Sequence, residues 1–376
     1  FLGEVEVVFG LWALVLTFAI LSINGKQAAT TYLEQQSFTE PMFVFAIMVI
    51  AGSRPILQFA MLCVKKIAKI IPWSDGRAFY FVTLSFVPLL GSFITEPAAM
   101  TLAGLMLLER YYSKGITTKL KYATLGVLFV NISIGGTMTT FAAPPVLMVA
   151  TKWGWDLAFM FSTFGWKAII VVLVNTLVAT FVFRRELSEI HFDKESQEKR
   201  VPLPVLFIHL FFLVGVVVFA HHPEVFMGLL LFFIGFAHAY ERYQDRLILR
   251  EGLLVAFFLA GLVVLGAQQK WWLQPMLVGM DTTVLFYGAT FLTAFTDNAA
   301  LTYLGSLLEG TSPEFQYSLV AGAVTGGGLT VIANAPNPAG FAILKESFED
   351  DSIHPLGLLV AALPPTFVAI LAFQFL

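Results

Sequence analysis

Cysteine and charge are both scarce in this chain, and each scarcity argues against a class of protein. The 376 residues contain one cysteine, Cys63, so an intramolecular disulfide is impossible and a cysteine-based metal site is implausible. Charged residues make up only 12% of the sequence, whereas 58% of the residues are hydrophobic and 38 are phenylalanine. With a mean hydropathy of +0.81, this composition does not suit a water-exposed surface and indicates a polytopic membrane protein.

Long hydrophobic runs take the place of the missing charge. Several runs reach the roughly 20 residues that a helix needs to cross a hydrocarbon core, and none shows the alternation of barrel strands. We therefore predict an all-α polytopic protein of the inner (cytoplasmic) membrane with about ten spanning helices. Residues 5–23 follow Glu4 and Glu6 without a basic segment, so we interpret them as the first transmembrane helix rather than a signal peptide.

Enzyme signatures are missing as well. The sequence contains no His-Glu-x-x-His, no Gly-x-Ser-x-Gly and no glycine-rich phosphate loop. We therefore expect neither catalysis nor a cofactor, and no nucleic-acid partner. An intramembrane hydrolase of the aspartyl type stays as a minor alternative, because it would also place two acids within the membrane.

Basic residues are concentrated in four segments, at residues 65–77, 110–121, 184–200 and 242–250. Short basic loops stay on the cytoplasmic side, so the hydrophobic stretch between the first two segments must enter and leave the membrane on that side. The stretch forms either two thin helices or a re-entrant hairpin, and we favour a hairpin over residues 78–113, with Thr95-Glu96-Pro97 at its tip. Pro97 suits the first position of a new helix, and Glu96 suits a helix N-terminus. The N-terminus of the chain is expected on the cytoplasmic side.

The same pattern occurs again in the second half of the chain. The run Thr296-Asp297-Asn298-Ala299-Ala300 echoes Thr95-Glu96-Pro97-Ala98-Ala99, and it predicts a second hairpin over residues 283–310. A helix interrupted by glycine and proline follows each hairpin, at residues 123–152 and 317–347. The interruptions are Gly135-Gly136-Thr137 with Pro144-Pro145, and Gly326-Gly327-Gly328 with Asn334-Ala335-Pro336. Such breaks free carbonyl groups and helix ends to face a ligand rather than lipid.

The charge pattern predicts opposite orientations for the two copies. We divide the chain into residues 1–40, a first helix and outer loop; 41–183, the first repeat; 184–251, a connecting loop and helix pair; and 252–376, the second repeat. An inverted-topology repeat with two re-entrant hairpins and two broken transmembrane helices is typical of carriers that work by alternating access. The sequence therefore indicates a secondary active transporter.

Two carboxylates without a neighbouring lysine make the predicted site negative. Such a site suits a hard cation or a proton and repels an anion. Burial favours the protonated form of a carboxyl group and a bound cation favours the ionised form, so we expect Na+ and protons to compete at Glu96, Asp297 and Asn298. Arg54 interrupts an apolar run and is a candidate charge partner of an acid or, alternatively, a binding group for an anion.

The order of elements and the paired motifs resemble the ion transporter superfamily, and within it most closely the bacterial sodium/proton antiporters, over most of residues 41–376. In that superfamily the hairpin tips and the unwound segments enclose the ion site. The resemblance implies roles in ion and proton binding for Thr95, Glu96, Thr137, Thr139, Thr296, Asp297, Asn298, Thr330, Asn334 and Asn337. Dicarboxylate carriers of the superfamily have neutral tips, and this chain departs from them at Glu96 and Asp297.

Other interpretations of these residues stay open at this point. Glu96 could only cap a helix, the threonines could bond to the backbone, and Asn334 and Asn337 could only serve a turn. The main prediction is a cation/proton antiporter, for Na+, in contact with the lipid bilayer. The alternative is a Na+-coupled symporter of a small organic or inorganic anion, and a homodimer is compatible with either.

Overall fold

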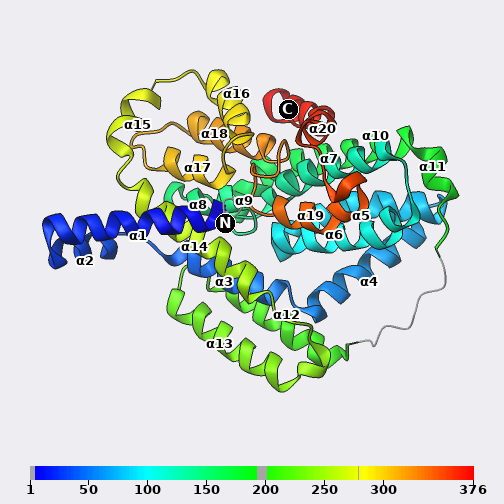
Figure 1. Ribbon diagram of the computed structural model, residues 1–376, viewed down its shortest axis with the longest axis horizontal. Coiled ribbons are helices and arrows are strands. Elements are labelled where there is room, and N and C mark those ends of the chain that lie inside the picture. The colour runs from blue at the N-terminus through cyan, green and yellow to red at the C-terminus, as the bar shows by residue number, and fades with distance from the viewer. Residues whose placement is uncertain (1–4, 193–200, 278) are drawn as a thin grey trace.

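The structure is a computed structural model that describes residues 5–192, 201–277 and 279–376, and every regular element in these ranges is a helix (Figure 1). The predicted all-α class is therefore confirmed. Five helices of this part of the chain are long and apolar enough to cross a membrane, or six if one bent pair counts as a single span. They support a multi-pass membrane protein, whereas the number of about ten spans stays a prediction.

The helices at the N-terminal side form an outer group. Helix α1 (Val5–Asn24) packs along α14 (Leu249–Gly266), where the rings of Phe9 and Phe258 meet edge to face at 5.1 Å. Helices α1 and α2 (Lys26–Glu34) project at the left of Figure 1. Helices α3 (Thr39–Ala51) and α4 (Arg54–Ile70) are bent by 64° relative to each other, because a new helix begins at Arg54, with Pro55 in its first turn, directly after Gly52 and Ser53.

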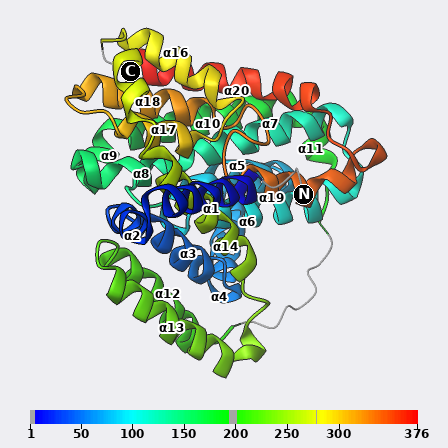
Figure 2. The same ribbon diagram turned by 60° about the vertical axis from the view of Figure 1, so that its left-hand side comes forward.

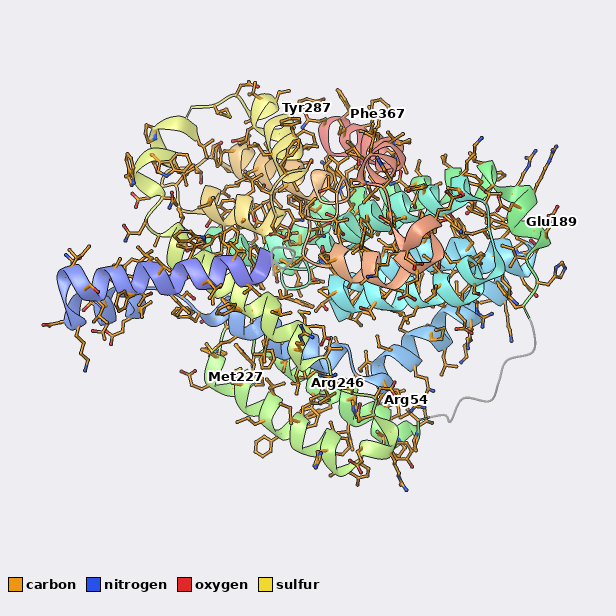
Figure 3. The ribbon with its side chains drawn as sticks, viewed as in Figure 1. Arg54, Glu189, Met227, Arg246, Tyr287 and Phe367 are labelled. Atoms are coloured by element: carbon orange, nitrogen blue, oxygen red, sulfur yellow. The ribbon has the colours of Figure 1, made fainter. Side chains whose placement is uncertain are left out.

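A helix pair covers α3 and α4 from outside. It consists of α12 (Leu203–Val218) and α13 (Pro223–Ala239), and it lies along the lower edge in both Figure 1 and Figure 2. Large apolar side chains point outward over the molecule, among them Phe211 (68% exposed) and, on the opposite edge, Phe367 (59% exposed; Figure 3). Exposed apolar surface of this extent fits contact with lipid.

Two groups of four helices form the centre of the molecule. Each group has a long helix, a second helix after a sharp break, a third helix, and a short fourth helix after an unwound segment. The first group contains α5 (Asp75–Ile94), α6 (Glu96–Arg110), α7 (Thr118–Gly135) and α8 (Pro144–Trp153). The second contains α16 (Thr282–Thr293), α17 (Asn298–Ser306), α18 (Pro313–Gly326) and α19 (Asn337–Leu344).

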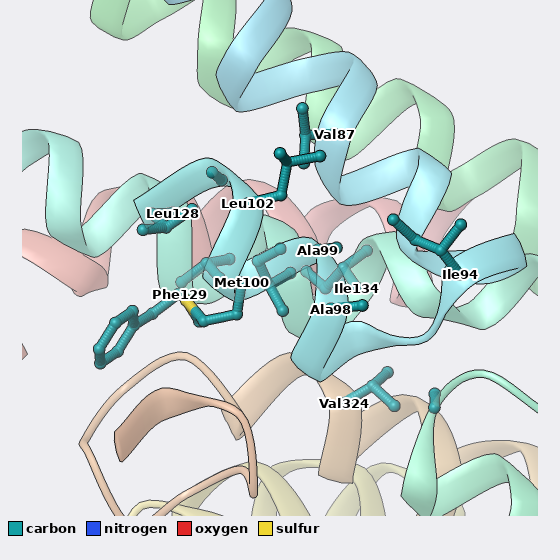
Figure 4. Packing of buried hydrophobic residues seen from close by; sticks show 14 of the residues in the cluster. Val87, Ile94, Ala98, Ala99, Met100, Leu102, Leu128, Phe129, Ile134 and Val324 are labelled. Atoms are coloured by element: carbon teal, nitrogen blue, oxygen red, sulfur yellow. The ribbon is translucent and has the colours of Figure 1, made fainter. Parts of the chain in front are cut away.

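The two central groups interlock. Helix α6 packs against α19, and α17 packs against α8, so each group receives the short last helix of the other. Apolar residues of both groups meet where α5 passes into α6, and Figure 4 shows Ile94, Ala98, Ile134 and Val324 gathered there. Helices α10 (Trp166–Val182) and α20 (Pro355–Phe375) pack along α7 on the outside.

Short elements connect these helices. They are α9 (Leu157–Met160), α11 (Arg184–Glu189), α15 (Lys270–Leu277), the π-helix Phe161–Gly165, and the 3-10 helices Tyr112–Lys114, Gly136–Met138, Glu241–Tyr243, Lys345–Ser347 and Glu349–Asp351.

Candidate functional site

The break between α5 and α6 is a single residue, Thr95. Its φ is 76° and its ψ is 150°, a conformation that a β-branched residue adopts only under strain. Glu96 follows as the first residue of α6, with its side chain fully buried, and its backbone N–H donates to the carbonyl of Ala142 at 3.4 Å. Position one of α6 puts the Glu96 carboxylate near the positive end of the helix dipole.

The break between α16 and α17 is longer and ends in a helix cap. The Oδ1 atom of Asp297 accepts from the backbone N–H groups of Ala299 at 2.8 Å and Ala300 at 3.2 Å, as an N-cap residue does. Asn298 is the first residue of α17 and is fully buried, and its N–H donates to the carbonyl of Ala333 at 3.0 Å.

The two unwound segments, residues 136–143 and 327–336, run beside these breaks. The hydroxyl of Thr139 donates to the carbonyl of Ser92 at 2.7 Å, and the hydroxyl of Thr330 donates to the carbonyl of Ala294 at 2.9 Å. Each unwound segment is thus tied to the helix that precedes the break in its own group.

Glycine is required where the unwound segments begin. A Cβ atom on Gly135 would lie 2.5 Å from the carbonyl oxygen of Pro88, and one on Gly326 would lie 2.4 Å from that of Thr290. A Cβ atom at either position would clash with the carbonyl oxygen. The close packing of α7 on α5, and of α18 on α16, therefore requires glycine at these two positions.

A hydrogen bond to Glu96 joins the two halves of the site. Asn334, in the unwound segment before α19, donates from Nδ2 to Oε2 of Glu96 at 2.8 Å. The other carboxylate oxygen, Oε1, lies against Gly136, where a Cβ atom would come within 2.4 Å of it. Asp297 is near enough to interact electrostatically with Glu96. The acids that the sequence singled out, from opposite halves of the chain, therefore face one region.

This region collects buried polar atoms that lack a hydrogen-bond partner. Within the described ranges, most of the buried side-chain atoms without a partner come from the two breaks and the segments beside them. They are Thr95 Oγ1, Glu96 Oε1, Thr293 Oγ1, Asn298 Oδ1 and Nδ2, Thr325 Oγ1, Asn334 Oδ1 and Asn337 Oδ1. Unpaired buried polar groups are costly. Most of these atoms are oxygens, which are the ligands of hard cations.

The side chains of the remaining predicted residues donate hydrogen bonds to backbone carbonyl groups. The hydroxyl of Thr137 donates to Ile134 O at 2.7 Å, and Nδ2 of Asn337 donates to Gly327 O and Thr330 O, both at 2.8 Å. Thr296 is exposed, and its hydroxyl donates to Leu292 O at 3.0 Å.

Arg54, a predicted charge partner of an acid, forms an ion pair with an acid outside the candidate site. Its Nη1 atom lies 3.4 Å from Oδ1 of Asp245, and the side chains are 26% and 73% exposed. Arg54 is at the start of α4, below the central groups in Figure 3.

Ser92 and Ser133 are structural residues of the site that the sequence analysis missed. The hydroxyl of Ser92 donates to Gly135 O at 2.6 Å and accepts from the N–H of Met138 at 3.0 Å. The hydroxyl of Ser133 donates to Val324 O at 2.8 Å and so joins α7 to α18. The position of Ser92 in the sequence, shortly before the Thr95-Glu96-Pro97 motif, was the signal that could have revealed it.

A family model described as "Putative Na+/H+ antiporter" matches residues 1–376, the whole chain. No curated protein matches the sequence.

Proposed function

Because the chain belongs to the Na+/H+ antiporter family that matches it over its whole length, we propose that it exchanges a monovalent cation, Na+, for protons at the meeting point of its two central helix groups. The Glu96 carboxyl group binds either the proton or the cation. Asn298 and Asp297 complete the site from the opposite group.

The single observation that carries this proposal is the environment of Glu96. The side chain is fully buried, Oε2 accepts from Asn334, and Oε1 has no hydrogen-bond partner among the residues that the structure describes. An ionised carboxylate in this position needs a cation, and without one it takes up a proton. Proton and cation therefore exclude each other at one atom, which is the requirement for coupled exchange.

Neutral oxygens supply the other cation ligands. The side-chain oxygens of Thr95, Asn298, Asn334 and Asn337 are buried without a partner beside the breaks, and carbonyl groups of the unwound segments add further ligands. Thr137, Thr139 and Thr330 donate their hydroxyl protons to carbonyl groups, which leaves their oxygen lone pairs as weaker ligands. Thr296 is exposed, and we assign it to the entry of the site.

For the transport cycle we propose alternating access between two inverted repeats. Supporting observations are the equal order of helices in the two central groups, the equivalent bonds of Thr139 and Thr330, and the reciprocal packing of α6 on α19 and α17 on α8. In this proposal α5–α6 and α16–α17 are re-entrant hairpins, and α7–α8 and α18–α19 are broken spanning helices of the cytoplasmic membrane, with the N-terminus on the cytoplasmic side. Rocking of one group against the other exposes Glu96 to each side in turn.

One observation favours antiport over the symport alternative. Arg54 was the residue that favoured binding of an anion, and it forms an ion pair with Asp245.

Proton flux in proteoliposomes tests the proposed function. A pH-sensitive dye inside the vesicles reports proton movement when Na+, Li+, K+ or Ca2+ is added outside, with Glu96→Gln measured beside the wild type. We expect Na+ to trigger proton movement in the wild type and not in the variant. If no cation triggers proton movement and the vesicles instead take up an anion in a Na+-dependent way, the proposal is contradicted and symport is favoured.

A further inference from the structure

The two helix tips correspond in a register that the sequence echo does not show. Aligning Thr95-Glu96-Pro97-Ala98-Ala99 with Thr296-Asp297-Asn298-Ala299-Ala300 pairs Glu96 with Asp297. In the structure, Glu96 begins α6 and Asn298 begins α17, while Thr95 and Asp297 occupy the preceding N-cap positions. The structural counterpart of Glu96 is therefore Asn298.

Backbone contacts with the unwound segments give the same register. The N–H of Glu96 donates to Ala142 O, and the N–H of Asn298 donates to Ala333 O. Ala142 and Ala333 occupy the same position relative to the glycines that end α7 and α18.

A second pair of contacts agrees with the first. The carbonyl of Ser92 accepts from Thr139 and that of Ala294 accepts from Thr330. Ser92 precedes Glu96 by as many residues as Ala294 precedes Asn298. The alignment of the two sequence motifs therefore differs by one residue from the alignment of the two helix starts in the structure.

We propose that Glu96 is the single proton-exchanging group of this transporter and that Asn298 is its matching partner that cannot ionise, so that one monovalent cation is exchanged for one proton without net movement of charge. This inference rests on the proposed function and adds the class of substrate and the coupling ratio. An amide at the second tip supplies an oxygen ligand but no proton.

Asp297 takes a different part. Its Oδ1 atom accepts two backbone N–H groups at the start of α17, where a negative charge is stabilised by the helix dipole. These bonds engage Asp297 as the cap of α17, whereas Oε1 of Glu96 accepts no hydrogen bond from the described residues, so we assign the exchanged proton to Glu96 and none to Asp297. The two loaded forms of the transporter have equal charge.

The ligand set favours a monovalent cation. The described part of the chain contains no group of three or more His, Cys, Asp or Glu side chains that could hold a metal ion. A site with one exchanging carboxylate and otherwise mainly neutral oxygens lacks the several anionic ligands that tight divalent sites use. We expect Na+ or Li+ to drive proton movement, and Ca2+ to fail.

Voltage dependence in proteoliposomes tests the coupling ratio. Vesicles containing valinomycin hold a set membrane potential through their K+ gradient, and the cation gradient at which proton flux reverses is measured. If one net charge moved per cycle, a potential of about 60 mV would shift that cation gradient about tenfold. For the wild type we expect no shift.

The variant Asn298→Asp gives the second tip its own ionisable group. We expect its reversal gradient to shift about tenfold with about 60 mV, because two protons then exchange for one cation. Asn24→Asp, the same change at the exposed end of α1, is the matched control and should stay insensitive to voltage.

The outcomes separate the two proposals. Exchange in the wild type that shifts with voltage would overturn the single-proton inference and leave the antiport function standing. Absence of any cation-triggered proton flux would overturn the antiport function itself. Because the wild-type measurement alone decides the ratio, the inference stays falsifiable if Asn298→Asp does not fold.

Discussion

Asn334 donates a hydrogen bond from Nδ2 to Oε2 of Glu96 at 2.8 Å. The two residues are far apart in the sequence and belong to the two different central helix groups. The bond fixes one oxygen of the carboxylate and leaves the other directed towards the unwound segment at Gly136. We infer that Asn334 presents Glu96 to the cation.

Removal of this bond should weaken cation binding. We expect Asn334→Ala to raise the Na+ concentration for half-maximal proton flux about tenfold or more, because a hydrogen bond to a charged group contributes about 1.5–3 kcal/mol. The measurement is a Na+ titration of proton flux in proteoliposomes. An unchanged half-maximal concentration would show that Asn334 does not position Glu96.

Gly136 should tolerate no side chain. A Cβ atom there would lie 2.4 Å from Oε1 and 2.6 Å from Cγ of Glu96, so Gly136→Ala must displace the carboxylate. We expect loss of Na+-driven proton flux in a protein that still elutes as a single species in size-exclusion chromatography. Gly228→Ala in α13 is the matched control, since its added Cβ meets none of the described residues within 4 Å apart from its chain neighbours and the backbone of its own helix. Equal flux in both variants would contradict the assigned geometry.

Thr95 should lower the stability of the fold while contributing to Na+ binding. A β-branched residue at φ 76° and ψ 150° is strained by about 1–3 kcal/mol, and glycine adopts this conformation freely. We expect Thr95→Gly to raise the unfolding temperature and to weaken Na+ binding, since it removes the buried Oγ1 atom. Thermal unfolding followed by tryptophan fluorescence, paired with a Na+ titration, checks both effects. A variant that is less stable and binds Na+ normally would refute this assignment.

Asp297 should contribute to stability through its cap. Asp297→Ala removes the acceptor of two N–H groups and should lower the free energy of unfolding by about 1 kcal/mol. Asp297→Ser keeps an N-cap oxygen and should recover most of this loss, as measured by thermal unfolding. In Asp297→Ser the reversal gradient should stay insensitive to voltage, as in the wild type. A wild type that responds to voltage, together with an Asp297→Ser variant that does not, would mean that Asp297 exchanges protons as well.

Helix breaks were the part of the fold that the sequence predicted best. Helix α7 ends at Gly135 and α8 begins at Pro144, because backbone restrictions of glycine and proline act locally and are visible in the sequence. The all-helical class follows from hydrophobic run length for the same reason.

Tertiary contacts could not be predicted in this way. The pairing of Arg54 with Asp245 and of Asn334 with Glu96 depends on how distant helices pack. The motif echo located both helix breaks but aligned Glu96 with Asp297. Identical Thr and Ala neighbours favoured that alignment, whereas the backbone register is defined only by contacts with the unwound segments. The positive φ of Thr95 was also invisible, because a β-branched residue is the least expected choice there.

The protons released when Na+ binds show directly whether cation and proton compete for the Glu96 carboxyl group. Purified protein in detergent is titrated with Na+ by calorimetry in two buffers that differ in ionisation enthalpy, and the difference in heat gives the protons released per cation bound. We predict one proton per Na+ for the wild type and none for Glu96→Gln. Na+ binding without proton release, or equal release from Glu96→Gln, would contradict the account.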